Sequence, residues 1–129
     1  MITVEDVLMH KGPDVVVAEG GATVLDGAKL MAAGKVGSII IREDGRVLGI
    51  FTERDLLCRV VAAGKDPTGT LLREVMTSPV ENCHLADDIQ DCGRRMAQRH
   101  IRHMAVIEDE ALVGLIGLRD ILQVGRDKS

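Results

Sequence analysis

The chain repeats itself, and this repeat limits the folds that it can adopt. The segment Gly49–Leu56 reads GIFTERDL and returns 65 residues later, at Gly114–Ile121, as GLIGLRDI. Both copies are an apolar, strand-like run that leads into a charged helix start. The same spacing extends back to Val36 and Ile101 without a gap. Self-similarity of this kind predicts a tandem of two similar units.

Each copy predicts the same order of elements: a lead-in helix, a strand, a helix, two strands and a closing helix. Hydrophobic residues three or four positions apart indicate the helices, and β-branched runs indicate the strands. The Asp44-Gly45 step suits a tight hairpin turn. The expected helices cover 4–9, 24–34, 52–64, 71–76, 89–96 and 118–124, and the expected strands cover 15–18, 38–42, 47–51, 80–83, 104–107 and 112–116.

The sequence also indicates where several of these helices begin and end. Thr3 and Asp6 form a capping-box pattern at the first helix, and Gly12 with Pro13 should end it. Gly34 should stop the second helix. Either Asp87 or Asp88 should open the helix of the second copy, and residues 126–129 are expected to fray. Met9 is matched to Met76, two residues out of step with the main repeat.

The predicted fold class is therefore α/β (α+β), with two units that form one globular module. The first unit covers 1–66 and includes the N-terminal lead-in helix, and the second covers 67–129. The chain has 129 residues and is 46% hydrophobic. A unit of about 65 residues is marginally stable alone, so the halves are expected to pack on each other.

Composition argues against several classes of function. The net charge is −4, and the chain has no Trp or Tyr and one Phe, Phe51, so nucleic acid is an unexpected partner. No apolar run is long enough to span a membrane, and the N-terminus does not resemble a signal peptide. We therefore expect a cytoplasmic protein. Cys58, Cys83 and Cys92 form no disulfide or zinc pattern, which predicts reduced thiols.

Three motifs, in this order along the chain, resemble those of a tandem CBS-domain pair, also called a Bateman module. They are Ile50–Asp55, Glu74–Thr77 and Arg102–Val106, and the resemblance extends over almost the whole chain. It implies two small units related by pseudo-twofold symmetry and packed by their sheets. It also implies adenine nucleotides in clefts between the units, and a module that senses and does not catalyse.

The resemblance also bears on partners. Small stand-alone members of this family commonly form flat homodimers, so we expect a homodimer that acts on a separate effector protein. The ligand would be AMP, ADP, ATP, NAD or S-adenosylmethionine, with any Mg²⁺ carried by the nucleotide. The residues do not decide among these ligands, because all five contain adenosine. No enzyme motif such as G-x-S-x-G or a P-loop is present.

Thr52 and Asp55 are the leading candidates for ligand contact. Free backbone N–H groups in the first turn of a helix favour phosphate, and a carboxylate can accept hydrogen bonds from ribose. The alternative is a capping box that only stabilises the helix. Asp120 repeats the position of Asp55, whereas Gly117 lacks the hydroxyl of Thr52. We therefore expect the first copy to be the better site.

The remaining candidates are weaker. Arg54 and Arg119 stand beside the aspartates and offer donors to phosphate, or are exposed helix arginines. The resemblance places Arg102, His103 and Ser38 near the phosphates, and Val16, Val80 and Asn82 near the adenine. The basic residues between 94 and 103 could attract an anion, although Arg94 and Arg95 suit a solvated helix face. Two alternatives stay open: a dimerising interaction scaffold, and a redox-linked regulator of a thioredoxin-type partner.

Overall fold

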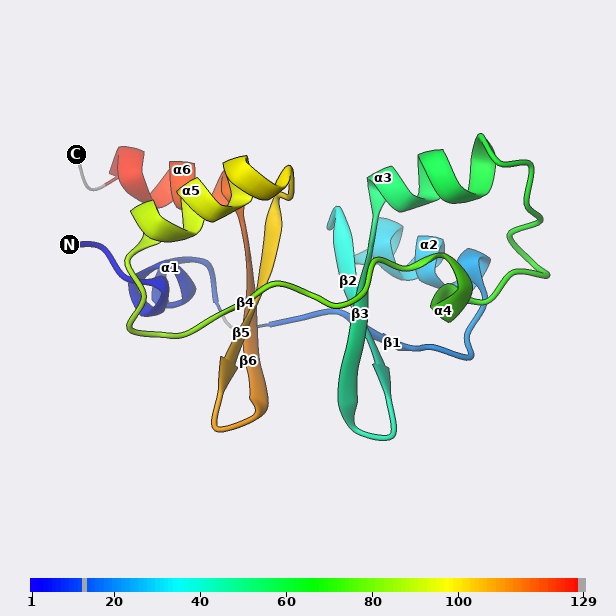
Figure 1. Ribbon diagram of the computed structural model, residues 1–129, viewed down its shortest axis with the longest axis horizontal. Helices are drawn as coiled ribbons and strands as arrows, with labels where there is room; N and C mark the ends of the chain where they lie inside the picture. Colours follow the sequence, from blue (N-terminus) through cyan, green and yellow to red (C-terminus); the bar gives the residue numbers. More distant parts are fainter. Residues whose placement is uncertain (13, 128–129) are drawn as a thin grey trace. The chain divides into compact units, whose positions relative to one another are not determined.

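Two three-stranded sheets, β1-β2-β3 and β4-β5-β6, organise the chain. The computed structural model describes residues 1–12 and 14–127. The sheets belong to two separate units. The first unit is Val15–Val80, and the second combines the described parts of Met1–Asp14 and Glu81–Ser129. In each unit the helices lie on one face of the sheet (Figure 1).

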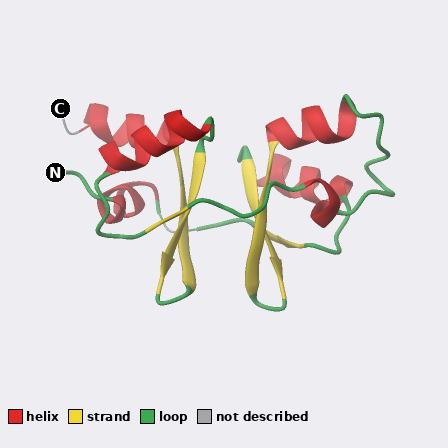
Figure 2. Cartoon of the chain, in the orientation of Figure 1, coloured by secondary structure: helices red, strands yellow, loops and turns green. Residues whose placement is uncertain are grey.

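The first unit contains β1 (Val17–Glu19), α2 (Val24–Gly34), β2 (Ser38–Glu43), β3 (Arg46–Thr52), α3 (Glu53–Asp55), η1 (Leu56–Val61) and α4 (Leu72–Val75). Strand β1 pairs with β2 in parallel, and β2 pairs with β3 in an antiparallel hairpin. The second unit contains α1 (Val4–Lys11), β4 (Asn82–Cys83), α5 (Ile89–Arg99), β5 (His103–Glu108), β6 (Ala111–Gly117) and α6 (Leu118–Asp127). Its sheet has the same pairing. Figure 2 distinguishes the helices, strands and loops of both units by colour.

Both predicted hairpins are confirmed, and their turns explain the sharp reversals. Asp44 and Gly45 have φ values of 53° and 76°, and Asp109 and Glu110 have values of 49° and 66°. Positive φ at both central residues is the feature of a type I′ turn, whose twist matches that of the flanking strands. The second turn achieves this without glycine, at a conformational cost to Glu110.

The core of each unit lies between its sheet and its helices. In the first unit, Phe51 is fully buried against residues of β2, α2, η1 and α4. In the second, Met104 and Ile116 are fully buried with residues of α1, α5 and α6. Helix α1 contributes Val4, Val7 and Leu8 to this second core. Among the described residues, no helix is long and apolar enough to cross a membrane.

The two structural units do not coincide with the two units expected from the sequence. Helix α1 was expected to belong to 1–66, but it packs in the unit of 81–127, and α4 packs with residues 15–66. The lead-in helix of each copy thus completes the sheet and helices of the other copy. Hydrophobic periodicity predicts the helix but not the sheet that will bury it, because either core would accept the same apolar stripe.

Several predicted boundaries are wrong by one to three residues. Strand β1 begins at Val17 and β4 at Asn82, later than expected. Gly34 is the last residue of α2, and the residue that caps the helix in the left-handed conformation is Lys35, at φ 54°; His100 caps α5 in the same way. Helix α6 continues through Gly125 to Asp127. Pro13, Lys128 and Ser129 lie outside the described residues.

The helix after β3 departs from regular α geometry. It starts as α3 and continues as a π-helical segment, η1, in which backbone N–H groups bond five residues back. Ala62 N donates to Leu57 O at 2.8 Å, and Lys65 N donates to Val60 O at 2.9 Å. The spacing of apolar residues did not predict this, because a single wide turn changes the register only locally.

Candidate ligand site at the strand-to-helix junctions

The first junction joins β3 to α3 at Thr52. Thr52 Oγ1 accepts a hydrogen bond from Asp55 N at 3.2 Å, and Asp55 Oδ2 accepts one from Thr52 N at 3.0 Å. This reciprocal pair is the capping box that the Thr-x-x-Asp spacing predicts. Ser38, also buried, is the cross-strand neighbour of Thr52. The structure therefore brings Ser38, Thr52 and Asp55 together.

The carboxylate of Asp55 is closed off by its neighbours. The residue is only 4% exposed. Its Oδ2 also accepts from Thr52 Oγ1 at 3.2 Å, its Oδ1 accepts from Thr77 Oγ1 at 2.9 Å, and Arg59 Nε lies 3.6 Å from Oδ1. Both oxygens thus have partners within the first unit. A ligand hydroxyl would have to share or displace these hydrogen bonds.

The second junction joins β6 to α6 at Gly117 and is more open. Asp120 Oδ2 accepts from Gly117 N at 2.8 Å and from Lys11 Nζ at 2.9 Å. The Asp120 side chain is 25% exposed, so its carboxylate retains room for further donors. The aspartate beside the threonine is thus the more buried of the two, although the sequence favoured that junction because of its additional hydroxyl.

Steric crowding at the second junction explains why position 117 is a glycine. A Cβ atom on Gly117 would lie 3.3 Å from His103 Cδ2 and 3.4 Å from the Arg102 carbonyl oxygen. His103 is the cross-strand neighbour of Gly117, as Ser38 is of Thr52. The larger histidine occupies the space that a threonine side chain would need. The junction therefore brings together Arg102, His103, Gly117 and Asp120.

Lys11 is a member of this site that the sequence reasoning missed. It stands in the last turn of α1, and its Nζ donates to Leu115 O at 2.8 Å as well as to Asp120. The pair is partly exposed, with 29% of the Lys11 side chain accessible. The sequence shows that Lys11 is a basic residue near the end of a helix, but it does not show its contact with Asp120, which is 109 positions away.

The lead-in segments reach both junctions, and their register corrects the sequence alignment. Gly49 and Gly114 are equivalent positions, and their nearest lead-in side chains are Met76 and Leu8, respectively. Leu8 is therefore the structural counterpart of Met76, and the match of Met9 to Met76 is wrong by one residue. Thr77 and Lys11 then contact the two aspartates from nearby, although not identical, positions.

The other candidates occupy different surroundings. Arg54 and Arg119 are exposed in the first turns of α3 and α6. Val16 precedes β1, packs against the first core and accepts from Ile40 N at 3.0 Å. Val80 lies outside a strand, contrary to expectation. Asn82 is exposed on β4, and its carbonyl oxygen accepts from Arg95 Nη2 at 2.8 Å.

The basic cluster on α5 is largely neutralised by local carboxylates. Arg95 Nη2 lies 2.9 Å from Glu81 Oε2, and Arg99 also pairs with Glu81. Arg94 pairs with Asp91. These contacts agree with the solvated helix face expected for Arg94 and Arg95. They remove the main basis for expecting this cluster to attract an anion.

The thiols fall into two environments. Cys58 is exposed, whereas Cys83 and Cys92 are buried in the second core. Their mutual hydrogen bond and burial raise the pKa of the Cys83 thiol. Among residues 1–12 and 14–127, no group of three or more His, Cys, Asp or Glu side chains is arranged to hold a metal ion.

Comparison with known proteins identifies both repeats. The model of the CBS domain matches residues 3–62 and 72–127. The uncharacterised protein MK0525 of Methanopyrus kandleri is 32% identical over 113 residues, which cover 86% of this chain but 58% of that relative. The chain thus spans somewhat more than half of that protein's length.

Solved structures give the same result. The CBS-domain protein ATU1752 of Agrobacterium tumefaciens matches with a TM-score of 0.91 and 31% identity, over 96% of this chain and 99% of that one. A hexameric CBS-CP12 protein from bloom-forming cyanobacteria matches with a TM-score of 0.84 and 31% identity, over 95% and 70%. Both the order of elements and their arrangement within each unit are therefore those of CBS domains.

Proposed function

This chain belongs to the CBS-domain family, and from that premise we propose that it is a regulatory module that binds an adenosine-containing nucleotide at its strand-to-helix junctions. Tandem CBS pairs are generally regulatory modules. The observation that carries the proposal is the duplicated junction. In both copies an aspartate at the third helical position accepts a hydrogen bond from the backbone N–H group at the end of a strand, where a helix begins.

The junctions have the chemistry that a nucleotide needs. A carboxylate accepts hydrogen bonds from the two ribose hydroxyls, and the first-turn N–H groups favour phosphate oxygens. Arg119 and Arg102 add positive charge near the second junction. The candidate ligands share this adenosine group and differ mainly beyond it. The proposal therefore names AMP, ADP, ATP, NAD and S-adenosylmethionine as the ligands to test.

The geometry favours the Asp120 junction as the main site. Its carboxylate is partly exposed, and Lys11 supplies an ammonium group 2.9 Å away. At the Asp55 junction, a ribose would compete with hydrogen bonds from Thr52 and Thr77. Losing a hydrogen bond to a charged group costs about 1.5–3 kcal/mol, so binding there should be weaker by an order of magnitude or more.

Calorimetric titration of the purified protein with each of the five ligands tests the proposal, with ATP measured in the presence and absence of Mg²⁺. We expect micromolar binding of at least one ligand at one site per chain. Asp120→Ala should abolish this binding, whereas Asp55→Ala should leave it within about threefold, because its contacts are internal. Both variants must keep a wild-type circular dichroism spectrum.

Two results would reject the proposal. One is the absence of heat and of any melting-temperature shift with all five ligands. The other is binding that survives Asp120→Ala and Asp55→Ala together. Binding lost in Asp55→Ala and retained in Asp120→Ala would reject the assignment of the main site to Asp120. It would return that role to the Thr52 junction.

Transmission of the signal would follow from differential affinity. A nucleotide shifts an equilibrium between two arrangements only by the difference in its binding free energy for them. Coupling of about 1–3 kcal/mol is enough for a 5- to 150-fold response. Because the CBS-CP12 relative is hexameric, the proposal includes self-association of this chain, with the effector on a separate protein.

A dimerising scaffold is the second candidate, and one observation favours it. Asp55 makes only contacts that stabilise its own unit, as expected if the junction were purely structural. The two candidates differ in the titration above. A scaffold would bind none of the nucleotides, although it would still associate.

A further inference from the structure

Two thiols are neighbours inside the second unit. Cys83 ends β4 and Cys92 stands on α5, and each residue is only 1% exposed. Both belong to the same apolar core, and the Cys83 thiol is hydrogen-bonded to Cys92. Small rotations of two such side chains can bring their sulfur atoms to the bonding distance of about 2.05 Å. We call Cys83 and Cys92 the core dithiol.

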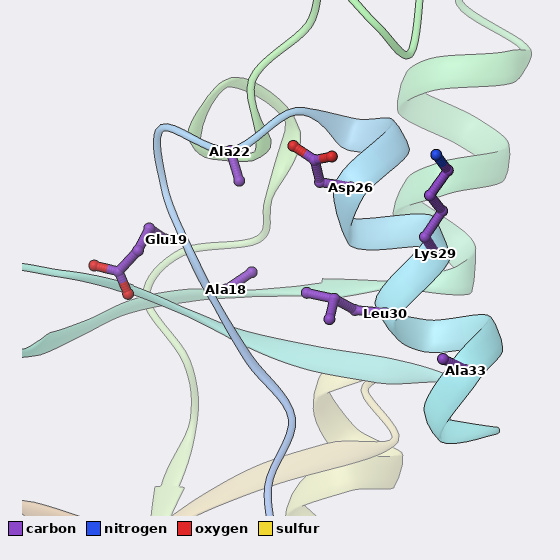
Figure 3. Close-up of a pocket in the computed structure, with 7 residues that line it drawn as sticks. All are labelled: Ala18, Glu19, Ala22, Asp26, Lys29, Leu30 and Ala33. Atoms are coloured by element: carbon purple, nitrogen blue, oxygen red, sulfur yellow. The ribbon is translucent and has the colours of Figure 1, made fainter.

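The internal repeat shows that the fold does not require this pair. The equivalent positions in the first unit are Ala18, which lines an open pocket beside α2 (Figure 3), and Gly27. A Cβ atom on Gly27 would lie 2.8 Å from Leu72 Cδ2, so a lead-in leucine fills that space. The lead-in residue of the second unit at this position is Val4, which is fully buried and one carbon shorter. The smaller side chain leaves room for the Cys92 thiol.

The two thiols differ in their tendency to ionise. The hydrogen bond from Cys83 lowers the pKa of the Cys92 thiol, whereas the same bond, together with burial, raises the pKa of Cys83. Asp87 and Asp88 oppose ionisation of Cys92, and Arg95 favours it. The thiolate is the nucleophilic form of cysteine. Cys92 is therefore the thiol that should react first, with Cys83 placed to react second.

We propose that the core dithiol is a redox site that closes to a disulfide when it reacts with a small hydroperoxide. The Cys92 thiolate attacks one peroxide oxygen, and the O–O bond breaks. The leaving oxygen takes up the proton that Cys92 lost, which gives a sulfenic acid at Cys92 and one molecule of water or alcohol. The Cys83 sulfur then attacks the Cys92 sulfur, and the hydroxyl group leaves with the Cys83 proton as water. The dithiol loses two electrons and the peroxide gains them.

Burial of the core dithiol selects the oxidant. Thiol–disulfide exchange requires that a sulfur of the incoming disulfide reach the thiolate, and neither cysteine offers a surface to a molecule as large as oxidised glutathione. Hydrogen peroxide is little larger than water. Strand β4 has only two residues, so a brief local opening at this strand is enough to admit it. The oxidant class is therefore a small hydroperoxide.

A disulfide would constrain the segment on which α1 begins. Residues 84–91 lie between the two cysteines. In this segment, Leu85 O accepts from Glu5 N at 3.0 Å, and Asp87 O accepts from Val4 N at 2.9 Å. Closing the loop restricts its local opening. Because α1 also supplies the lysine of the candidate site, the redox state reaches that site through α1.

The test uses the full chain with Cys58→Ser, which removes the exposed thiol. The reduced protein is treated with hydrogen peroxide, remaining thiols are alkylated with iodoacetamide in urea, and the tryptic peptides are analysed by mass spectrometry. Cys83 and Cys92 fall in one peptide, Glu74–Arg94. We expect this peptide to be unalkylated and about 2 Da lighter than its dithiol form, and to be alkylated twice after dithiothreitol. Oxidised glutathione should produce about tenfold less disulfide.

Two variants in the Cys58→Ser background test the order of reaction. In Cys83→Ser, the serine hydroxyl can still donate to Cys92 but cannot form a disulfide. The sulfenic acid should therefore accumulate, and dimedone added with the urea should capture it. In Cys92→Ser, capture at Cys83 should be about tenfold lower. Circular dichroism of both variants establishes that they are folded.

Hydrogen exchange measured by NMR tests the effect on α1. The amides of Val4 and Glu5 should exchange about threefold or more slowly in the oxidised chain than in the reduced chain. The amide of Gly49, on β3 of the other unit, is the control and should exchange at the same rate in both. Equal rates for Val4 and Glu5 in the two states would reject the link from the core dithiol to α1.

Three outcomes would overturn the redox site itself. The first is a Glu74–Arg94 peptide that is still alkylated twice after peroxide treatment. The second is oxidation that joins two chains and leaves no internal disulfide. The third is equal dimedone capture in the two serine variants, which would show that the pair has no preferred nucleophile. None of these results depends on nucleotide binding, because nucleotide-free protein is used.

Discussion

Replacing Gly49 by alanine should destabilise the first unit, for a reason that can be read from one contact. Gly49 lies on β3, where the lead-in segment crosses it. A Cβ atom there would lie 2.6 Å from the Thr77 carbonyl oxygen and 2.7 Å from Met76 Sδ. The carbonyl belongs to the backbone, and it also accepts from Ile50 N at 2.9 Å. It cannot retreat without stretching that bond.

The expected magnitude follows from three contributions. Forcing an extra carbon into a packed site costs about 1–3 kcal/mol, and a weakened hydrogen bond between Thr77 and Ile50 adds about 1 kcal/mol. The lower entropy of the unfolded alanine chain offsets about 0.4–1 kcal/mol. Gly49→Ala should therefore lower the free energy of unfolding by about 2 kcal/mol. Urea denaturation followed by circular dichroism measures this value.

Two other glycines provide matched controls. The three atoms nearest to a Cβ on Gly114, the equivalent of Gly49, would all belong to the Leu8 side chain, with both methyl carbons at 2.8 Å. That side chain can rotate, so Gly114→Ala should cost less than about 1 kcal/mol. A Cβ on Gly93 in α5 would meet nothing within 4 Å, and Gly93→Ala should stabilise by about 0.8–1 kcal/mol.

The order of the three variants is the decisive result. A Gly49→Ala protein as stable as the wild type would refute the steric argument. So would a Gly114→Ala protein that is less stable than Gly49→Ala, because a movable side chain would then resist the new methyl group more than a backbone carbonyl does. An unchanged slope of the free energy against urea concentration is required for the comparison, since it indicates an unaltered unfolding reaction.

Further predictions concern the two hairpin turns and the thiols. Glu110→Gly should raise the free energy of unfolding by about 0.5–1 kcal/mol, because Glu110 has φ 66°; Gly45→Glu should lower it by a similar amount, and equal stability of all three proteins in urea would contradict this. In native protein, iodoacetamide should modify Cys58 alone, with Cys83 and Cys92 reacting only in urea; mass spectrometry that finds a modified core cysteine without urea would disprove it.

Local features of the fold could be predicted because their causes are local. The Asp44-Gly45 turn and the capping boxes at Thr3 and Thr52 depend on residues within four positions of each other. Because the sequence repeats, the order of elements predicted for the first copy also applied to the second. The contacts of the candidate site were less accessible, because Thr77 and Lys11 lie 22 and 109 positions from the aspartates they contact. No periodicity encodes such a distance.

The two junctions also show why equivalent residues in a repeat need not share a role. Asp55 and Asp120 occupy the same helical position, and each caps its own helix. Beside Asp55, a threonine hydroxyl from the lead-in segment donates to the buried carboxylate, and Arg59 Nε lies 3.6 Å from the same oxygen. Beside Asp120, the lead-in segment supplies a charged lysine, and a Cβ atom on Gly117 would lie 3.3 Å from His103 Cδ2.

The lead-in segment therefore differentiates the two copies more than the shared motif does. The Thr77 hydroxyl donates one hydrogen bond to the Asp55 carboxylate, which stays buried. The Lys11 ammonium group instead places a positive charge beside Asp120, and both side chains remain partly exposed to solvent. If the junctions differ in affinity for an anionic ligand, the cause lies in Thr77 and Lys11 and not in the aspartates. Lys11→Met should then weaken nucleotide binding at Asp120 in calorimetry, and Thr77→Val should not; equal affinities in the two variants would show that the lead-in segments do not set the difference.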